Sequence, residues 1–205
     1  MTLYKGNTKI GTIYHGSTKI GKIYKGSTLV FSGEAYPSGY VLFESSTPGT
    51  YTFTPIANCK VSLILVSGGG GGANNNGRTT GGQGALITGN TTLSKGTEYT
   101  VVVGSGGATV DVGNGVTGGG CNGGNGGTSS ALGNTCNGGT GAHAHQGWWA
   151  TSYYNGSPGS GTVASSEFTL TTGTASTNGI YESYGAGGYV NNATNGYCKI
   201  VVISS

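Results

Sequence analysis

The chain has 205 residues, of which 45 are glycine and only 7% are charged, and its net charge is +3. Long glycine tracts bury little surface and lose much conformational entropy on folding, which argues against an ordinary globular enzyme. Disorder usually combines low hydrophobicity with high net charge, and collagen needs abundant proline at a period of three; the chain shows neither pattern. No apolar run reaches the roughly 18 residues of a membrane span, and the charge is too small for a nucleic-acid footprint, so neither is an expected partner. The composition predicts a folded, mostly β protein.

A repeat of ten residues opens the chain and brings a tyrosine to positions 4, 14 and 24. Each repeat places a Gly-Asn or Gly-Ser pair between two short runs of mixed apolar and polar residues, which is typical of a β-hairpin. About 30 residues cannot build a stable core alone. The sequence therefore predicts a small β-meander over residues 1–33 that docks on another chain or oligomerises, and a separate domain over residues 34–205.

Seven runs rich in β-branched and aromatic residues follow, and no window shows a helical period with caps. The predicted strands are residues 40–44, 51–54, 60–66, 85–93, 99–103, 167–171 and 197–203. Three glycine-rich insertions separate them, at residues 67–84, 104–161 and 172–196. This pattern predicts an all-β fold in which ordinary strands alternate with glycine tracts.

The tract at residues 118–127 has a period of three. One face carries Gly120, Gly123 and Gly126; a second carries Gly118, Gly124 and Gly127, interrupted by Cys121; the third carries Asn122, Asn125 and Thr128. Three residues per turn is the repeat of the polyproline II helix, which has no internal hydrogen bonds. Two bare glycine faces would let such helices pack side by side and satisfy their backbone groups between neighbours. A flexible linker is the alternative, and the alternation with good strands argues against it.

Four cysteines stand at positions 59, 121, 136 and 198. Cys59 and Cys198 begin two similar apolar runs and are predicted to be neighbours on paired strands, with a bridged and a reduced pair both open. Cys121 and Cys136 each head a Cys-Asn-Gly-Gly unit within the glycine-rich region. The first 30 residues lack the apolar core of a signal peptide, so we expect a reducing compartment.

Several runs between residues 45 and 205 occur in a characteristic order: PGTYTFT at 48–54, KVSLILV at 60–66, five glycines at 68–72, LSKGTEYTVVVG at 93–104 and GGTSS at 126–130. This ordered set resembles the glycine-rich domain of bacteriophage tail-fibre tip and adhesin proteins, and the N-terminal repeats resemble modules of phage tail and fibre proteins. The resemblance implies a β-sandwich scaffold that holds a bundle of polyglycine II helices, whose connecting loops recognise a host surface. The chain departs from the group in its less continuous glycine content and in its own segment at 142–161, so host specificity is not carried over.

Residues 143–155 contain the densest set of side chains suited to recognition. The candidate receptor-binding residues are His143, His145, Trp148, Trp149, Tyr153 and Tyr154. Aromatic residues among Ser, Asn and Gly are typical of binding loops, and they could stack on a surface glycan or grip an outer-surface protein. The alternative is that Trp148 and Trp149 cap the end of the glycine bundle as a small core. A second candidate loop contains Tyr181, Tyr184 and Tyr189.

Metal and enzyme sites find little support in the sequence. In a trimeric fibre, His143 and His145 could bring imidazoles around an axis, and with Cys121 and Cys136 they would supply zinc-type ligands. The spacing matches no common zinc motif, so we predict no metal and no cofactor. There is no Gly-x-Ser-x-Gly elbow, no His-Glu-x-x-His and no phosphate loop. Residues 112–166 contain no Asp, Glu, Lys or Arg and cannot supply a carboxylate pair.

These observations favour a non-enzymatic adhesin on the surface of a phage particle. Residues 1–33 would dock it to other virion proteins, as a homotrimer or on a trimeric fibre, and the aromatic loops would bind a host-cell surface receptor. The first alternative is a head fibre or capsid decoration protein with the same domain. The second is a cellular extracellular surface module, against which the missing signal peptide counts.

Overall fold

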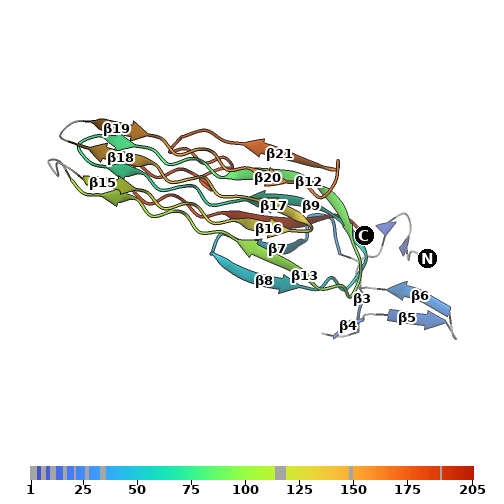
Figure 1. Ribbon diagram of the computed structural model, residues 1–205. Helices are drawn as coiled ribbons and strands as arrows, with labels where there is room; N and C mark the ends of the chain where they lie inside the picture. The colour runs from blue at the N-terminus through green and yellow to red at the C-terminus, as the bar shows by residue number, and fades with distance from the viewer. Residues whose placement is uncertain are drawn as a thin grey trace.

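The computed structural model describes residues 36–113, 119–147, 150–189 and 191–205, together with six short strands in the first 32 residues. Every element in these residues is a β-strand, which confirms the predicted all-β fold class. No helix in the described part of the chain is long and apolar enough to cross a bilayer. Figure 1 shows an elongated domain whose strands run along its long axis.

Antiparallel hairpins form within each of the N-terminal repeats. The pairs are β1 (Tyr4–Lys5) with β2 (Thr8–Lys9), β3 (Ile13–His15) with β4 (Thr18–Ile20), and β5 (Lys22–Lys25) with β6 (Thr28–Ser32). Lys5 pairs with Thr8 and His15 with Thr18, so two residues connect the strands, as the Gly-Asn and Gly-Ser pairs predicted. Each described strand of this region pairs only within its own repeat.

Two five-stranded antiparallel sheets form the scaffold. The first contains, in spatial order, β21 (Phe168–Thr172), β12 (Ala85–Leu93), β9 (Cys59–Val66), β22 (Tyr197–Ser204) and β7 (Val41–Ser45). The second contains β20 (Gly161–Thr162), β17 (Asn134–Cys136), β16 (Ser129–Ala131), β13 (Tyr99–Val103) and β8 (Gly49–Phe53). The seven predicted strands are all present with ends shifted by at most two residues, because they are rich in β-branched and aromatic residues.

One hydrophobic core joins the two sheets. In β9 the side chains of Val61, Leu63 and Leu65 are buried, whereas Lys60, just before Val61, is exposed. These side chains pack in one cluster with residues of the second sheet such as Val101, so the sheets lie face to face. Truncating one such leucine to alanine typically costs about 2–5 kcal/mol.

Cys59 and Cys198 do not lie side by side as predicted. β9 and β22 are neighbours, but they are antiparallel, and Cys198 lies opposite Leu65 while Cys59 lies opposite Leu93 of β12. Cys59 and Cys198 therefore occupy opposite ends of the strand pair, and the prediction that they are neighbours was wrong. The sequence pattern showed that both begin a strand but could not show that the strands run in opposite directions. All four cysteines are free and buried.

The glycine segment that leaves β9, at residues 67–72, lies at the centre of the bundle. Gly68 and Gly71 both donate N–H hydrogen bonds to carbonyls in residues 124–127, whereas Gly69 donates to Thr194 and Gly70 to Gly82. Residues three apart thus use the same neighbour, which is the hydrogen-bonding pattern of the polyglycine II arrangement predicted from the period of three.

The carbonyls of the same segment follow the same rule. Those of Gly68 and Gly71 accept from residues 139–142, that of Gly69 accepts from Gly107, and that of Gly70 accepts from Gly188. Six neighbouring segments thus surround the centre: residues 80–84, 104–109, 123–127, 137–142, 185–189 and 191–196. The backbone groups are satisfied between chain segments, so a side-chain core is not needed here.

Close approach explains why the centre consists of glycine. A Cβ atom built on Gly70 would lie 1.9 Å from the carbonyl oxygen of Thr140, and one on Gly71 would lie 1.9 Å from that of Ala108. No side chain fits at such distances, and only glycine allows the backbones to meet.

The predicted faces of the tract at residues 118–127 are confirmed in part. Asn122, Asn125 and Thr128 are exposed, as the third face requires. Gly120 does not belong to a polyglycine face, however, because Gly119–Asn122 forms strand β15, and Gly118 lies outside the described residues. The period of three begins at Gly123, where pairing with another strand ends.

Asparagine side chains complete the bundle where a neighbouring segment is missing. The Oδ1 atoms of Asn125, Asn155, Asn192 and Asn195 each accept a backbone N–H at 2.9 Å, from Gly141, Thr80, Thr109 and Gly106 respectively. Asn192 and Asn195 are three residues apart, and so are their donors, Thr109 and Gly106. These four amides replace the carbonyl of an absent neighbour, which gives these asparagines a structural role in the bundle.

Small sheets form the end of the domain farthest from the scaffold, here called the tip (Figure 1). One contains β11 (Arg78–Thr79), β10 (Ala73–Asn74) and β14 (Val110–Asp111). The other, the tip sheet, contains β15, β18 (His143–Gln146) and β19 (Thr151–Tyr154). Residues 67–72 lead from β9 to β10, and residues 137–142 lead from β17 to β18, so glycine segments carry the chain from the scaffold to the tip.

Candidate functional site

The tip sheet brings four of the candidate receptor-binding residues together. Asn122, His143 and Tyr154 lie in one cross-strand row, and His145 lies two rows further on, between Gly120 and Ser152. Paired residues in antiparallel strands project to the same side of a sheet. The sheet therefore has an outer face with His143, His145 and Tyr154, and an inner face with Cys121, Ala144 and Tyr153.

The inner face packs against the bundle. Cys121 and Ala144 are buried in a small apolar cluster with Ala73 and Ala142. Tyr153 is 39% exposed, and its hydroxyl donates a hydrogen bond to the carbonyl of Asn75 at 3.2 Å. These contacts hold the sheet in a fixed orientation on the glycine segments.

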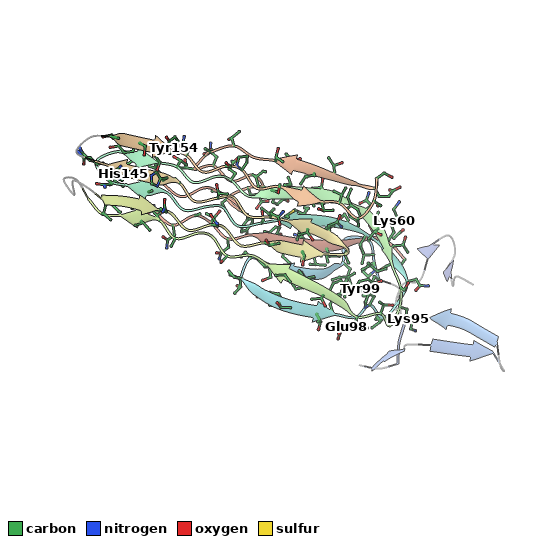
Figure 2. All side chains as sticks on the ribbon, viewed as in Figure 1. Lys60, Lys95, Glu98, Tyr99, His145 and Tyr154 are labelled. Atoms are coloured by element: carbon green, nitrogen blue, oxygen red, sulfur yellow. The ribbon has the colours of Figure 1, made fainter. Side chains whose placement is uncertain are left out.

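Stacked rings occupy the outer face. The rings of Tyr154 and His143 have centroids 6.0 Å apart, and those of His143 and His145 are 6.4 Å apart and inclined by only 5°. Nδ1 of His143 lies 2.5 Å from Oδ1 of Asn122, which orients the imidazole. Tyr154 is 64% exposed, so the column presents aromatic surface to solvent (Figure 2).

Gly120 leaves room for this column. A Cβ atom at this position would lie 3.2 Å from Cδ2 of His145 and 3.5 Å from Cε1 of His143. Asn122 and Gly120 therefore shape the outer face, although sequence reasoning did not include them in the site. Their place depends on the register of β15 against β18, which no local signal reveals.

Most of the chain matches the sequence model of a known protein family. A model of the glycine-rich domain family matches residues 45–199. The chain belongs to this family. The matched region runs from the end of β7 into β22 and includes the bundle and both tip sheets, whereas the N-terminal hairpins lie outside it. A comparison with curated proteins found no significant match.

The segment predicted as an aromatic loop of the glycine-rich domain is largely a hairpin. β18 and β19 pair antiparallel, and Gly147 donates an N–H to the carbonyl of Ala150 at 2.8 Å, so the connection is short. Alternation of His143, Ala144 and His145 between the two faces was the available signal. Trp148 and Trp149 lie outside the described residues, in the connection between these strands.

The second tyrosine loop of the glycine-rich domain divides between two roles. Tyr181 and Tyr184 stack on Tyr197, with ring centroids 5.9 Å and 4.4 Å apart. Tyr197 belongs to β22, and its hydroxyl donates to Oε1 of Glu44 at 2.5 Å, so these rings pack on the scaffold. Tyr189 is 38% exposed and lies beside Arg78.

The four-ligand zinc set considered from the sequence is not assembled. The Sγ atom of Cys121 donates to the carbonyl of Val110, and that of Cys136 donates to the carbonyl of Leu65 in the scaffold core. The two cysteines lie in separate apolar clusters. Within the described residues, no group of three or more His, Cys, Asp or Glu side chains is placed to hold a metal ion.

Proposed function

We propose that this glycine-rich domain protein is a non-enzymatic attachment protein on the surface of a bacteriophage particle. The outer face of the tip sheet, with His143, His145 and Tyr154 and the adjoining Trp148 and Trp149, binds a host-cell surface receptor. Residues 1–33 dock the protein to other virion proteins, as a homotrimer or on a trimeric fibre. The exposed ring column at the tip is the observation that carries this proposal.

The position of this column supports it. The described chain enters the domain at Tyr36, whose hydroxyl accepts the N–H of Ile56 and whose carbonyl accepts the hydroxyl of Ser205. The start and the end of the domain therefore lie together. Lys60 and Lys95 lie at the scaffold end of the domain, and His145 and Tyr154 at the opposite end (Figure 2). A protein mounted through its N-terminus would thus present the ring column away from the particle.

The bundle supplies the rigidity that such a surface needs. Each backbone of the centre is hydrogen-bonded to several neighbours, so the tip sheet is fixed before it meets a receptor. Binding then requires little ordering of the protein, and large aromatic contacts are made at a low cost in conformational entropy. Stacking and neutral hydrogen bonds are the interactions that the outer face offers to a glycan or to an outer-surface protein.

Cell binding by purified variants tests the proposal. The labelled full-length protein is incubated with a panel of bacterial strains and bound fluorescence is measured by flow cytometry. We expect strain-selective binding that is lost in a triple variant carrying Trp148→Ala, Trp149→Ala and Tyr154→Ala. Tyr40→Ala is the matched control, because Tyr40 is 47% exposed and lies close to Tyr36, where the domain begins.

The outcomes separate the alternatives. Unchanged binding by the triple variant, with a melting temperature equal to that of the original protein, would refute the tip as the receptor surface. Immunogold labelling of particles distinguishes a tail-fibre position from a head-fibre or decoration position. Light scattering of the full chain tests the expected trimer.

A further inference from the structure

A second surface, on the flank of the bundle, has the properties of a ligand site. It is an open groove of about 400 Å³ between residues 186–189 and 191–194. Its side chains come from Thr177, Tyr189, Asn191, Asn192 and Thr194, and its floor includes the backbones of Gly187 and Gly188. Among the described residues, no charged side chain and no large aliphatic side chain lines it, so these residues offer hydrogen-bonding groups and one aromatic ring.

The walls of this groove are fixed by the bundle. Gly187 and Gly188 donate their N–H groups at 2.8 Å to the carbonyls of Ser176 and Gly70. The two lining segments are joined directly, because Thr194 donates its N–H to the carbonyl of Ala186 and its hydroxyl oxygen accepts the N–H of Ala186 at 2.7 Å. A ligand would therefore meet a preformed surface.

Several polar groups of the groove are unused. Oδ1 of Asn192 accepts the N–H of Thr109, and its amide N–H₂ makes no hydrogen bond within the described residues. In the same part of the chain, the side chains of Asn191 and Thr177 also make none. Donors and acceptors beside an aromatic ring suit the hydroxyl groups and the C–H face of a pyranose.

Arg78 adds a positive charge at the rim. Its guanidinium carbon lies 5.8 Å from the ring centroid of Tyr189. Arg78 is exposed, and it forms no ion pair in the described part of the chain. The nearby carboxylate, Asp111, instead accepts hydrogen bonds from the amide of Asn74 and the N–H of Gly113. A stacked guanidinium with free N–H groups is suited to bind a carboxylate or phosphate through two parallel hydrogen bonds.

We propose that this groove binds an anionic sugar, with the pyranose ring against Tyr189 and the polar groups of Asn191, Asn192 and Thr177, and the anionic group on Arg78. A neutral sugar would use the groove but leave Arg78 without a function. The site is separate from the ring column of the tip sheet and does not depend on receptor binding there.

Titration of the full ¹⁵N-labelled protein with small sugars tests this proposal. The probes are glucuronate, which carries a carboxylate, glucose 6-phosphate, which carries a phosphate, and methyl glucoside, which is neutral. We expect an anionic sugar to shift the side-chain amide signals of Asn191 and Asn192, and methyl glucoside to bind at least about tenfold more weakly. The response to the two acids identifies the preferred anion.

Variants of Arg78, compared with control variants elsewhere on the domain, test whether the anionic group binds at Arg78. Arg78→Gln should weaken binding of the anionic sugar at least about tenfold, and Arg78→Lys should weaken it less, because the charge remains while the planar fork is lost. Lys60→Gln removes an equal charge at the scaffold end and should have no effect. Tyr154→Ala should leave sugar binding intact even where it abolishes cell attachment.

Two results would overturn the groove assignment. The first is the absence of shifts at Asn191 and Asn192 with either acid at 50 mM, a concentration of about the scale at which single sugars bind weak sites. The second is sugar binding that Tyr154→Ala abolishes and Arg78→Gln leaves unchanged, which would place the sugar on the tip sheet.

Discussion

Replacement of Gly70 by alanine tests the central claim that direct backbone contact holds the bundle together. The new Cβ atom would lie 1.9 Å from the carbonyl oxygen of Thr140, whereas an ordinary contact begins near 3.4 Å. The two segments must therefore separate by roughly 1.5 Å. Gly70 lies at the centre of the bundle, so no outward movement relieves the contact without disturbing other neighbours.

The expected loss follows from the hydrogen bonds at this point. Gly70 donates to Gly82 at 2.8 Å and accepts from Gly188 at 2.8 Å, and Thr140 accepts from Gly82 at 3.0 Å. Stretching three such bonds costs about 0.5–1.5 kcal/mol each. Alanine also lowers the conformational entropy of the unfolded chain, which offsets about 0.4–1 kcal/mol of this loss. We expect Gly70→Ala to lower the free energy of unfolding by about 2 kcal/mol, within a range of about 0.5–4 kcal/mol, and the melting temperature by about 4–8 °C for a chain of this length.

Gly124→Ala is the matched control within the same bundle. Its Cβ atom would lie 3.1 Å from the backbone nitrogen of Ala108, so a shift of a few tenths of an ångström is enough. Thermal and urea unfolding should therefore show a loss of less than about 1 kcal/mol for this variant. The reasoning fails if the two variants are equally stable, or if Gly70→Ala lies within about 0.5 kcal/mol of the original protein.

Three further predictions concern the groups that surround the bundle and the core. Asn195→Ala leaves the N–H of Gly106 without its acceptor and should lower the free energy of unfolding by about 1–3 kcal/mol, whereas Asn195→Asp, which keeps the acceptor oxygen, should lose less in the same urea titration. The hydrogen bond from Tyr197, with a further contribution from a nearby lysine, lowers the pKa of Glu44, so this carboxylate stabilises the fold above its unfolded pKa and the contribution is lost as the pH falls through the lowered folded value. Glu44→Gln should flatten the pH dependence of the melting temperature between about pH 5 and pH 3, and an unchanged slope would contradict the assignment. Burial raises the pKa of the Cys136 thiol to about 12, so the native protein should react slowly with Ellman's reagent at pH 8 and rapidly in urea; equal rates would show that the thiol is accessible.

The sequence predicted the scaffold well and the tip poorly, for a physical reason. The scaffold strands are runs rich in β-branched and aromatic residues, and β12 and β13 begin and end where those runs do. The strands of the tip are only two to four residues long and contain few apolar residues, and they form because the glycine segments bring them side by side. Such pairing arises from tertiary structure and leaves little local signal beyond the alternation of His143, Ala144 and His145.

The site was predicted by composition but not by geometry. The density of His, Trp and Tyr at residues 143–155 pointed to the segment, whereas only the register of β18 against β15 and β19 shows that His143 and Tyr154 share a face and that Tyr153 lies on the other. The stacking of Tyr184 on Tyr197 was equally beyond reach, because the two residues lie in different elements.

Different residue types hold the bundle together and form the outer face of the tip sheet, so the chain combines a rigid body with a surface that should tolerate substitution. Glycines form the bundle, and asparagines such as Asn195 supply a hydrogen-bond acceptor where a backbone N–H has no neighbouring segment. Both residue types are therefore needed to hold the bundle together, and replacing them lowers the stability of the fold. The aromatic side chains of Tyr154 and His145 take no part in the backbone hydrogen bonds of the bundle, and Tyr154 is largely exposed. Substitutions on the outer face of the tip sheet should therefore change recognition while stability stays within about 0.5 kcal/mol, which is the property that allows a surface to be altered without rebuilding its support.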